Sequence, residues 1–162
     1  MIRDYVDHQA KARPDATYLV APETGRTMSF GSLRSASLRL AAFLRGRHVE
    51  PGDKVGLLMH NGYQACRLFI GAMYGGYCVT PFNLLAQPSQ LEYVLDHSDV
   101  ALIFASPDQE PRLREALQNI GRAIQVVICD VDAEEFLPPA ADDGEPLAPL
   151  GEEDVALMMY TS

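Results

Sequence analysis

The chain lacks several features that would assign it to a large functional class. It has no run approaching the ~18 consecutive apolar residues of a membrane span. Its first eight residues include early acids and no apolar core, which argues against a signal peptide and favours a cytoplasmic location. Neither half carries the basic stripe that nucleic-acid binding requires. The sequence therefore predicts neither a membrane-spanning nor a nucleic-acid-binding protein.

Side chains arranged for metal binding or catalysis are also scarce. Cys66, Cys78 and Cys129 have no CxxC or cysteine–histidine spacing, so they are predicted to be small buried apolar residues rather than zinc ligands. Because isolated histidines are more often structural, no catalytic residue and no metal ligand is predicted among the four present, which are His8, His48, His60 and His97.

Basic residues are absent from the last quarter of the chain. All 13 Lys and Arg residues lie at or before Arg122, while ten of the 22 acids lie after it. The first 122 residues, with 13 basic residues against 12 acids, carry a net charge of +1 out of a total of -9. The acidity therefore belongs to the tail, where a solvated surface loop is the simplest interpretation.

What is present is sufficient for one folded domain. The chain has 162 residues, of which 48% are hydrophobic and 22% charged, as in globular proteins. Its central stretch, residues 53–83, predicts a buried strand at 55–59, a helix capped by Asn61, a stop at Gly75-Gly76 and a second strand ending at Pro81. A strand, a helix and a strand with tight joints form a βαβ unit with parallel strands.

The remaining patterns alternate in the same way. They predict a helix over 3–12, a hairpin of 17–21 and 26–29, a helix from the cap Ser29 to about Arg45, a helix from a capping box at Ser89–Glu92, a strand at 100–105, a helix from Pro111 to Gly121 and a strand at 125–129. This order is typical of a doubly wound, mainly parallel α/β sheet flanked by helices.

Three segments are expected along the chain. Residues 1–132 form the α/β unit with a small hairpin near 17–29, residues 133–150 form an acidic, proline-rich surface loop, and residues 151–162 contain a final strand at 155–160. Ligands of such sheets bind outside the carboxyl ends of the strands. The strand ends of interest are therefore 59–61, 80–81, 105–106 and 160–162.

Several of these segments, in this order, are similar to the opening of the AMP-forming acyl-CoA synthetases, which belong to the adenylate-forming superfamily. The matching pieces cover nearly the whole chain: Pro14-Asp15-Ala16, residues 27–33, residues 49–55, Gly76 to Asn83, residues 91–98 and Tyr160-Thr161-Ser162. The last piece resembles the first residues of that family's phosphate loop, which implies that Thr161 and Ser162 bind the cofactor.

The resemblance implies the N-terminal subdomain of a larger acid–CoA ligase of the kind used in fatty acid metabolism. The intact enzyme would use ATP, Mg²⁺ and CoA to activate a small carboxylic acid. The rest of the phosphate loop, the metal carboxylate and the catalytic lysine would lie beyond Ser162. The 162 residues alone are therefore expected to be inactive, to bind no cofactor and to self-associate through the uncovered final strand.

Other classes remain open at this stage. An adenylation domain that activates an amino acid shares the same N-terminal pattern. A small non-catalytic module for a nucleotide or flavin is a further alternative, although no GxGxxG follows an early strand. A non-catalytic interaction domain would use the acidic tract at 130–154.

Overall fold

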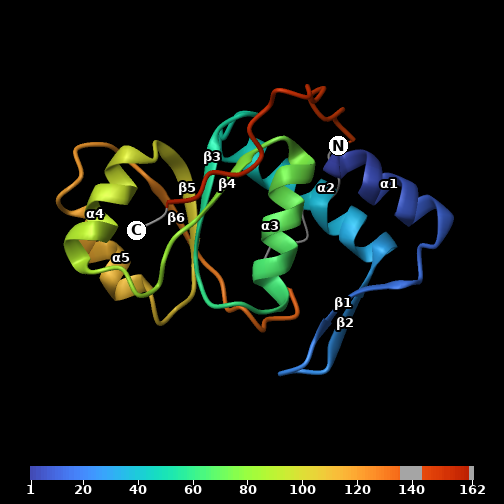
Figure 1. The fold of residues 1–162 in the computed structure, drawn as a ribbon, viewed down its shortest axis with the longest axis horizontal. Coiled ribbons are helices and arrows are strands. Elements are labelled where there is room, and N and C mark those ends of the chain that lie inside the picture. Colours follow the sequence, from blue (N-terminus) through green and yellow to red (C-terminus); the bar gives the residue numbers. More distant parts are fainter. Residues whose placement is uncertain (136–143, 161–162) are drawn as a thin grey trace.

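The computed structural model describes residues 1–135 and 144–160. Its centre is a four-stranded parallel sheet in the order β4-β3-β5-β6, with helices on both faces (Figure 1). The elements in chain order are α1 (Ile2–Ala12), β1 (Thr17–Ala21), β2 (Arg26–Ser29), α2 (Phe30–Gly46), β3 (Lys54–Leu58), α3 (Tyr63–Gly75), β4 (Cys78–Pro81), α4 (Pro88–His97), β5 (Val100–Ala105), α5 (Glu110–Leu117) and β6 (Gln125–Ile128). The doubly wound α/β architecture predicted from the sequence is confirmed.

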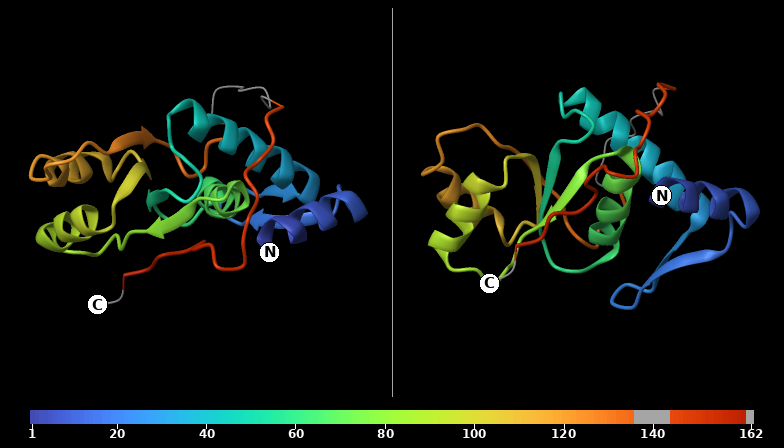
Figure 2. Two further views of the ribbon diagram at one scale, coloured as in Figure 1. Left: turned by 90° about the horizontal axis from the view of Figure 1, so that it is seen from above. Right: turned by 45° about the horizontal axis from the view of Figure 1, so that its top comes forward.

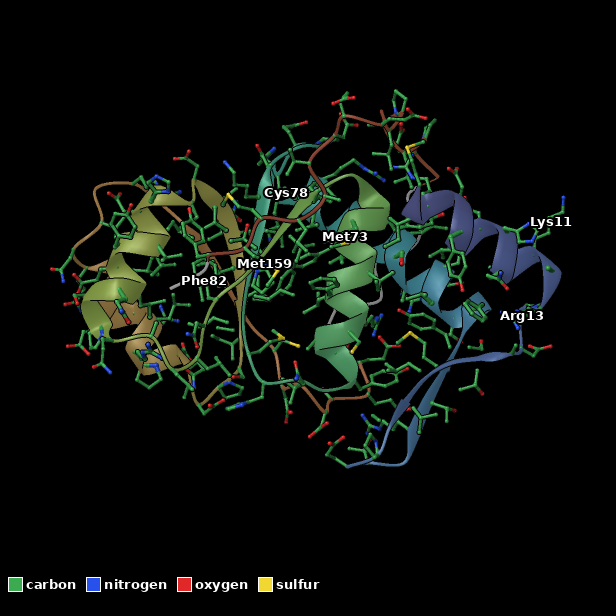
Figure 3. All side chains as sticks on the ribbon, viewed as in Figure 1. Lys11, Arg13, Met73, Cys78, Phe82 and Met159 are labelled. Atoms are coloured by element: carbon green, nitrogen blue, oxygen red, sulfur yellow. The ribbon has the colours of Figure 1, made fainter. Side chains whose placement is uncertain are left out.

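The middle of the sheet is β3, which pairs with β4 on one side and β5 on the other. The side chains around Gly56 in this strand leave no room for a larger residue. A Cβ at this position would lie 2.7 Å from the Phe82 ring and 2.8 Å from Ile103. Phe82 therefore packs closely against Gly56 of the central strand, on the side of the sheet covered by α4 (Figure 3).

Each face of the sheet has its own hydrophobic core. On one face Leu40 and Leu44 of α2 and Leu68 of α3 pack with Phe104. On the other face, Leu91 and Leu95 of α4 and Leu113 of α5 pack with Leu58 of β3 and Ile103 of β5. The two helix layers are visible on opposite sides of the sheet in Figure 2. Alternate side chains of each strand serve opposite cores, as the period of two requires.

A third, smaller core joins α1 and the β1–β2 hairpin to α3. It is made by Val6, Met28, Leu33 and Tyr74, all buried. Arg3 extends from α1 across this junction. Its Nε donates to the carbonyl of Tyr74 at 2.8 Å and its Nη1 to the carbonyl of Ala148 at 2.7 Å. The first helix is thereby attached to the late part of the chain.

Two predicted helix caps are wrong. α3 begins at Gly62 with no side-chain cap, because the long-range carbonyl of Val131 accepts the Gln64 N–H at 2.9 Å in place of Asn61. The N-cap of α4 is Gln87 rather than Ser89, and Pro88 is the first residue of the helix, where its fixed φ is suitable. The Gln90 side chain accepts from the Gln87 N–H at 2.8 Å. The helix predicted from Pro111 to Gly121 ends early, at Leu117, and the remaining expected elements lie within about two residues of their predicted bounds.

The strand predicted at 155–160 is reduced to one parallel bridge between Val79 and Leu157. The Val79 N–H donates to Ala156 and the Met158 N–H donates to Val79, both at 2.9 Å. Figure 1 shows this last segment crossing β4. Its apolar side chains are exposed, 65% for both Val155 and Met159. Because pairing would bury little apolar surface, only the residues around Leu157 hydrogen-bond to β4.

The remaining expectations concern domain boundaries and membranes. The predicted loop at 133–150 is described only at its two ends, because residues 136–143 lie outside the described part of the chain. None of the helices that the structure describes is long and apolar enough to cross a membrane.

Candidate functional site

The sheet has a topological switch point between β3 and β5. β4, the strand that follows β3 in the chain, lies on one side of β3, and β5 lies on the other side of β3. The chain leaves these two strands through Met59-His60-Asn61 and through Ser106 to Asp108. The Ser106 N–H donates to the Leu58 carbonyl at 3.1 Å, which holds the two strand ends together. Ligands of doubly wound sheets bind at such a point.

A cavity of about 580 Å³ opens at this edge and is called the strand-edge cavity below. Most of its wall is apolar and comes from α3, the end of β3, the loop after β4 and the hairpin. The lining residues are Tyr18, Leu57, Met59, His60, Asn61, Ala65, Cys66, Phe69, Ile70, Pro81, Phe82, Asn83 and Leu84. An apolar wall with a few polar groups is typical of a small-molecule site.

Next to the polar part of this cavity, His60 and Asp108 form a pair. Nε2 of His60 lies 3.2 Å from Oδ2 of Asp108, and both side chains are exposed. The pKa of Asp108 is lowered by the Ser106 hydroxyl and by the Gln109 amide, whose Nε2 donates at 2.8 Å. The lowered pKa favours the ionised carboxylate, which lies beside the His60 ring as a hydrogen-bond acceptor.

The cavity also contains a thiol and a phenol that stay protonated. Burial raises the pKa of the Cys66 thiol. Burial, followed by the nearby Cys66 and Tyr5, raises the pKa of Tyr18. Both groups therefore act as weak hydrogen-bond partners rather than as nucleophiles. All three cysteines are free, and Cys78 and Cys129 are buried as predicted, whereas Cys66 is half-buried.

A further polar group is buried without a partner at the same edge. The side chain of Thr80, in β4, is fully buried, and its hydroxyl has no hydrogen-bond partner among the described residues. Thr80 is one of the strand-end residues predicted to be of interest. It supplies a spare donor and acceptor close to the end of a sheet strand.

Tyr160 is placed beside the loop after β4. Its hydroxyl lies 2.9 Å from Nδ1 of His97, and it lines a cavity of about 310 Å³ with Asn83, Ser89 and Tyr93. Asn83 also lines the strand-edge cavity, so one residue borders both spaces. The described chain therefore ends, at Tyr160, beside a residue that borders the strand-edge cavity. Thr161 and Ser162 themselves lie outside the described residues.

Sequence reasoning found the strand ends but missed the pairs that they form. His60 and His97 were predicted to be structural, yet they contact Asp108 and Tyr160, residues 48 and 63 positions away. Asp108 follows a strand end within a Ser-Pro-Asp turn, and that position was the available signal. Among the described residues, no three His, Cys, Asp or Glu side chains come together as metal ligands would.

Comparison with known proteins agrees with this geometry. Residues 6–162 match the family model described as AMP-binding enzyme. A sulfoacetate–CoA ligase of Cupriavidus necator is 39% identical over 151 residues, which are 92% of this chain and 30% of that protein. The long-chain-fatty-acid–CoA ligase FadD13 of Mycobacterium tuberculosis is 27% identical over 157 residues, 95% of this chain and 31% of that protein.

Solved structures show the same relationship. A fatty acyl CoA synthetase of Mycobacterium tuberculosis superposes with a TM-score of 0.85 at 26% identity, covering 99% of this chain and 32% of that one. The chain spans about a third of the length of the relatives that it matches. The match to the family model extends over almost every residue from the first helix onward, and the fold is the one that the family's solved members share. The chain therefore belongs to the family of AMP-binding enzymes.

Proposed function

We propose that this chain provides the N-terminal part of an ATP-dependent, AMP-forming carboxylic acid–CoA ligase. The observation that carries the proposal is the 39% identity to a CoA ligase along 92% of the chain. Relatives of lower identity that also cover most of the chain, a long-chain-fatty-acid–CoA ligase and a feruloyl-CoA synthase, are named for the same chemistry on other acids.

The proposed reaction has two steps. A carboxylate oxygen attacks the α-phosphorus of ATP, which forms the acyl-adenylate and releases pyrophosphate. The thiolate of CoA then attacks the acyl carbon, which forms the thioester and releases AMP. Mg²⁺ bound with ATP would neutralise charge on the phosphates, but the described residues contain no cluster of carboxylates that would hold it.

The described residues would bind and orient rather than react. We assign the strand-edge cavity to the organic part of the acid, because its walls are mostly apolar and lie at the carboxyl ends of β3 and β4. We assign His97 to orienting Tyr160, and through it Thr161 and Ser162, which would donate to phosphate oxygens. A cytoplasmic location, where ATP and CoA are available, is part of the same proposal.

Pyrophosphate exchange into ATP tests the first step. The protein that contains the whole family region is incubated with ATP, labelled pyrophosphate and one acid from a panel of sulfoacetate, a fatty acid, ferulate, benzoate and several amino acids. Exchange that requires a carboxylic acid, followed by thioester formation only when CoA is added, is the expected result. Exchange that occurs only with the amino acids would favour an amino-acid adenylation domain. If none of the acids in the panel supports exchange, the proposal is contradicted.

Residues 1–162 assayed alone give a matched control. We expect no exchange from them, because the charges that would stabilise the transferred phosphoryl group are not among these residues. An acyl-adenylate formed by residues 1–162 would overturn this part of the proposal.

A further inference from the structure

A second cavity lies away from the strand edge, between the first turns of α2 and α3. It has a volume of about 400 Å³ and is called the α2–α3 cavity below. Its wall contains the guanidinium groups of Arg39 and Arg67 and hydroxyl groups of Ser32, Ser35 and Tyr63. Hydroxyls and guanidinium groups are hydrogen-bond donors that suit an anion. Nothing in the proposed ligase chemistry uses this cavity.

The arginine at its base is deeply buried. The side chain of Arg67 is 4% exposed, and an arginine keeps its charge at any ordinary pH. A buried charge requires an anionic partner. In the structure its contacts include Glu135, whose side chain is 61% exposed, and Gln64, whose Oε1 lies 3.4 Å from Arg67 Nη1. One anionic contact of this buried cation is thus a carboxylate that remains mostly in solvent.

The contacts between the two charges are long. Oε2 of Glu135 lies 3.3 Å and 3.4 Å from the two terminal nitrogens of Arg67, and Oε1 lies 3.7 Å from Nη2 of Arg39. Charge-assisted hydrogen bonds are typically ~2.7–2.9 Å long. A single carboxylate is therefore shared between two guanidinium groups on different helices. A tetrahedral oxyanion, with oxygens pointing in more directions, would reach both groups and the neighbouring hydroxyls.

We propose that the α2–α3 cavity is a binding site for a tetrahedral oxyanion, such as a phosphate or sulfonate group, and that the Glu135 carboxylate is its displaceable internal occupant. When Glu135 turns away, the lining keeps two arginines against one carboxylate, Asp15. The first turn of α2 carries no acid, so the positive end of its dipole adds to the field. An incoming anion then replaces the charge that Glu135 withdraws.

Glu135 can leave without unfolding its own segment. The Gln64 side chain donates to the carbonyls of Ala133 and Glu134, at 2.6 Å and 3.1 Å, and these bonds hold the backbone independently of the Glu135 carboxylate. Only side-chain torsions need to change. A tethered competitor of this kind acts at an effective concentration in the millimolar range. Free anions should therefore bind weakly to the native protein and more tightly once Glu135 is neutralised.

Calorimetric titration with inorganic phosphate tests the proposal, with potassium chloride added to keep the ionic strength constant. Glu135→Gln should tighten phosphate binding about tenfold, the effect of removing a competitor worth about 1.4 kcal/mol. Glu134→Gln is the matched control, since it removes the same charge one residue away, from a side chain that does not line the cavity, and it should bind as the native protein does. Arg39→Gln in the Glu135→Gln background should weaken binding by about tenfold or more.

Competition with methanesulfonate extends the test to the second oxyanion, and we expect it to displace phosphate from Glu135→Gln. Equal phosphate affinity in the native protein, Glu134→Gln and Glu135→Gln would overturn the proposal. Undiminished binding after Arg39→Gln, or failure of methanesulfonate to compete, would overturn it as well. Because Arg39 and Glu135 are partly exposed, these variants are expected to keep the native circular dichroism spectrum, whereas replacing the buried Arg67 would confuse binding with folding.

Discussion

The hydroxyl oxygen of Tyr160 lies 2.9 Å from Nδ1 of His97, the last residue of α4. The two rings meet edge to face with centroids 5.8 Å apart, and Tyr93 stacks on His97 at 5.5 Å. The last described residue of the chain is therefore held by the C-terminal end of a helix that begins some 70 residues earlier. The position of Tyr160 is thus tied to α4.

Tyr160→Phe should loosen the last segment while keeping its ring. A hydrogen bond of this kind contributes about 0.5–1.5 kcal/mol. Its loss should speed amide exchange at Met158, whose N–H donates to Val79. Hydrogen exchange followed by NMR measures the effect. Tyr93→Phe leaves the bond between His97 and Tyr160 intact and should exchange at the native rate; equal rates in both variants would contradict the prediction.

Gly56→Ala should destabilise the sheet by about 1–3 kcal/mol, because the new methyl group would overlap Phe82 and Ile103. Urea denaturation measures the free energy of unfolding. Gly46→Ala is a suitable control, because a Cβ there meets nothing within 4 Å and alanine favours the helix. A Gly56→Ala variant as stable as the native protein would show that Phe82 moves aside without cost.

Ser29→Ala should cost about 1 kcal/mol in the free energy of unfolding, since the Ser29 hydroxyl accepts the Ser32 N–H at 3.2 Å at the start of α2. Asn61→Ala should change that free energy by less than about 0.5 kcal/mol, because Asn61 does not cap α3. The same denaturation experiment compares the two. A larger loss for Asn61→Ala than for Ser29→Ala would contradict the assignment of the caps.

Stability should fall in alkaline solution partly through Tyr74. Burial, then the hydrogen bond to Asp7 and its charge, raise the pKa of Tyr74 from 10.0 to about 12. Below pH 10 both the folded and unfolded chains keep this proton. Between pH 10 and about 12 only the folded chain keeps it, so stability falls as the pH rises, by an amount on the order of 1–2 kcal/mol.

Tyr74→Phe checks this prediction, because it removes the titrating group and keeps the buried ring. Its stability should depend less steeply on pH above 10 than that of the native protein. The Cys129 thiol, whose pKa burial raises from 9.0 to about 12, should still contribute a decline that begins near pH 9 in both proteins. Identical slopes above pH 10 would contradict the assignment to Tyr74.

Residues 1–162 should self-associate through the outer face of the last segment. Val155 and Met159 are each 65% exposed, and Leu157 between them is 38% exposed, which gives an apolar row beside a sheet edge. Sedimentation velocity over a range of concentrations should show the association. Val155→Thr with Met159→Thr should shift the distribution toward monomer; a native protein that stays monomeric throughout would refute the prediction.

Local patterns in the sequence were enough to predict most of the fold. The hairpin strands Thr17–Ala21 and Arg26–Ser29, and β5 at Val100–Ala105, have their predicted bounds because alternation and turn residues define them locally. The stop after α3 was equally clear. Gly76 adopts a φ of +94°, which glycine accepts without strain.

Partners distant in the sequence were beyond these patterns. At the start of α3, the carbonyl of Val131 accepts the Gln64 N–H, and the carbonyl of Ala133 accepts from the Gln64 side chain. No local motif at Asn61 can reveal these two contacts. The pair of His60 and Asp108 likewise requires β3 and β5 to be neighbours, although β4 lies between them in the chain. The sequence therefore pointed to the strand ends at which the strand-edge cavity lies, while the contact between His60 and Asp108 needed the sheet order.

The bond between Arg3 and Ala148 has a consequence for synthesis in the cell. The two residues are 145 positions apart, and translation adds about 5–20 residues per second. The arginine thus leaves the ribosome roughly 7–30 seconds before its second carbonyl partner exists. During that interval α1 can dock on Tyr74, but one side of its guanidinium group stays hydrated. The contacts of α1 are therefore complete only after Ala148 has been synthesised.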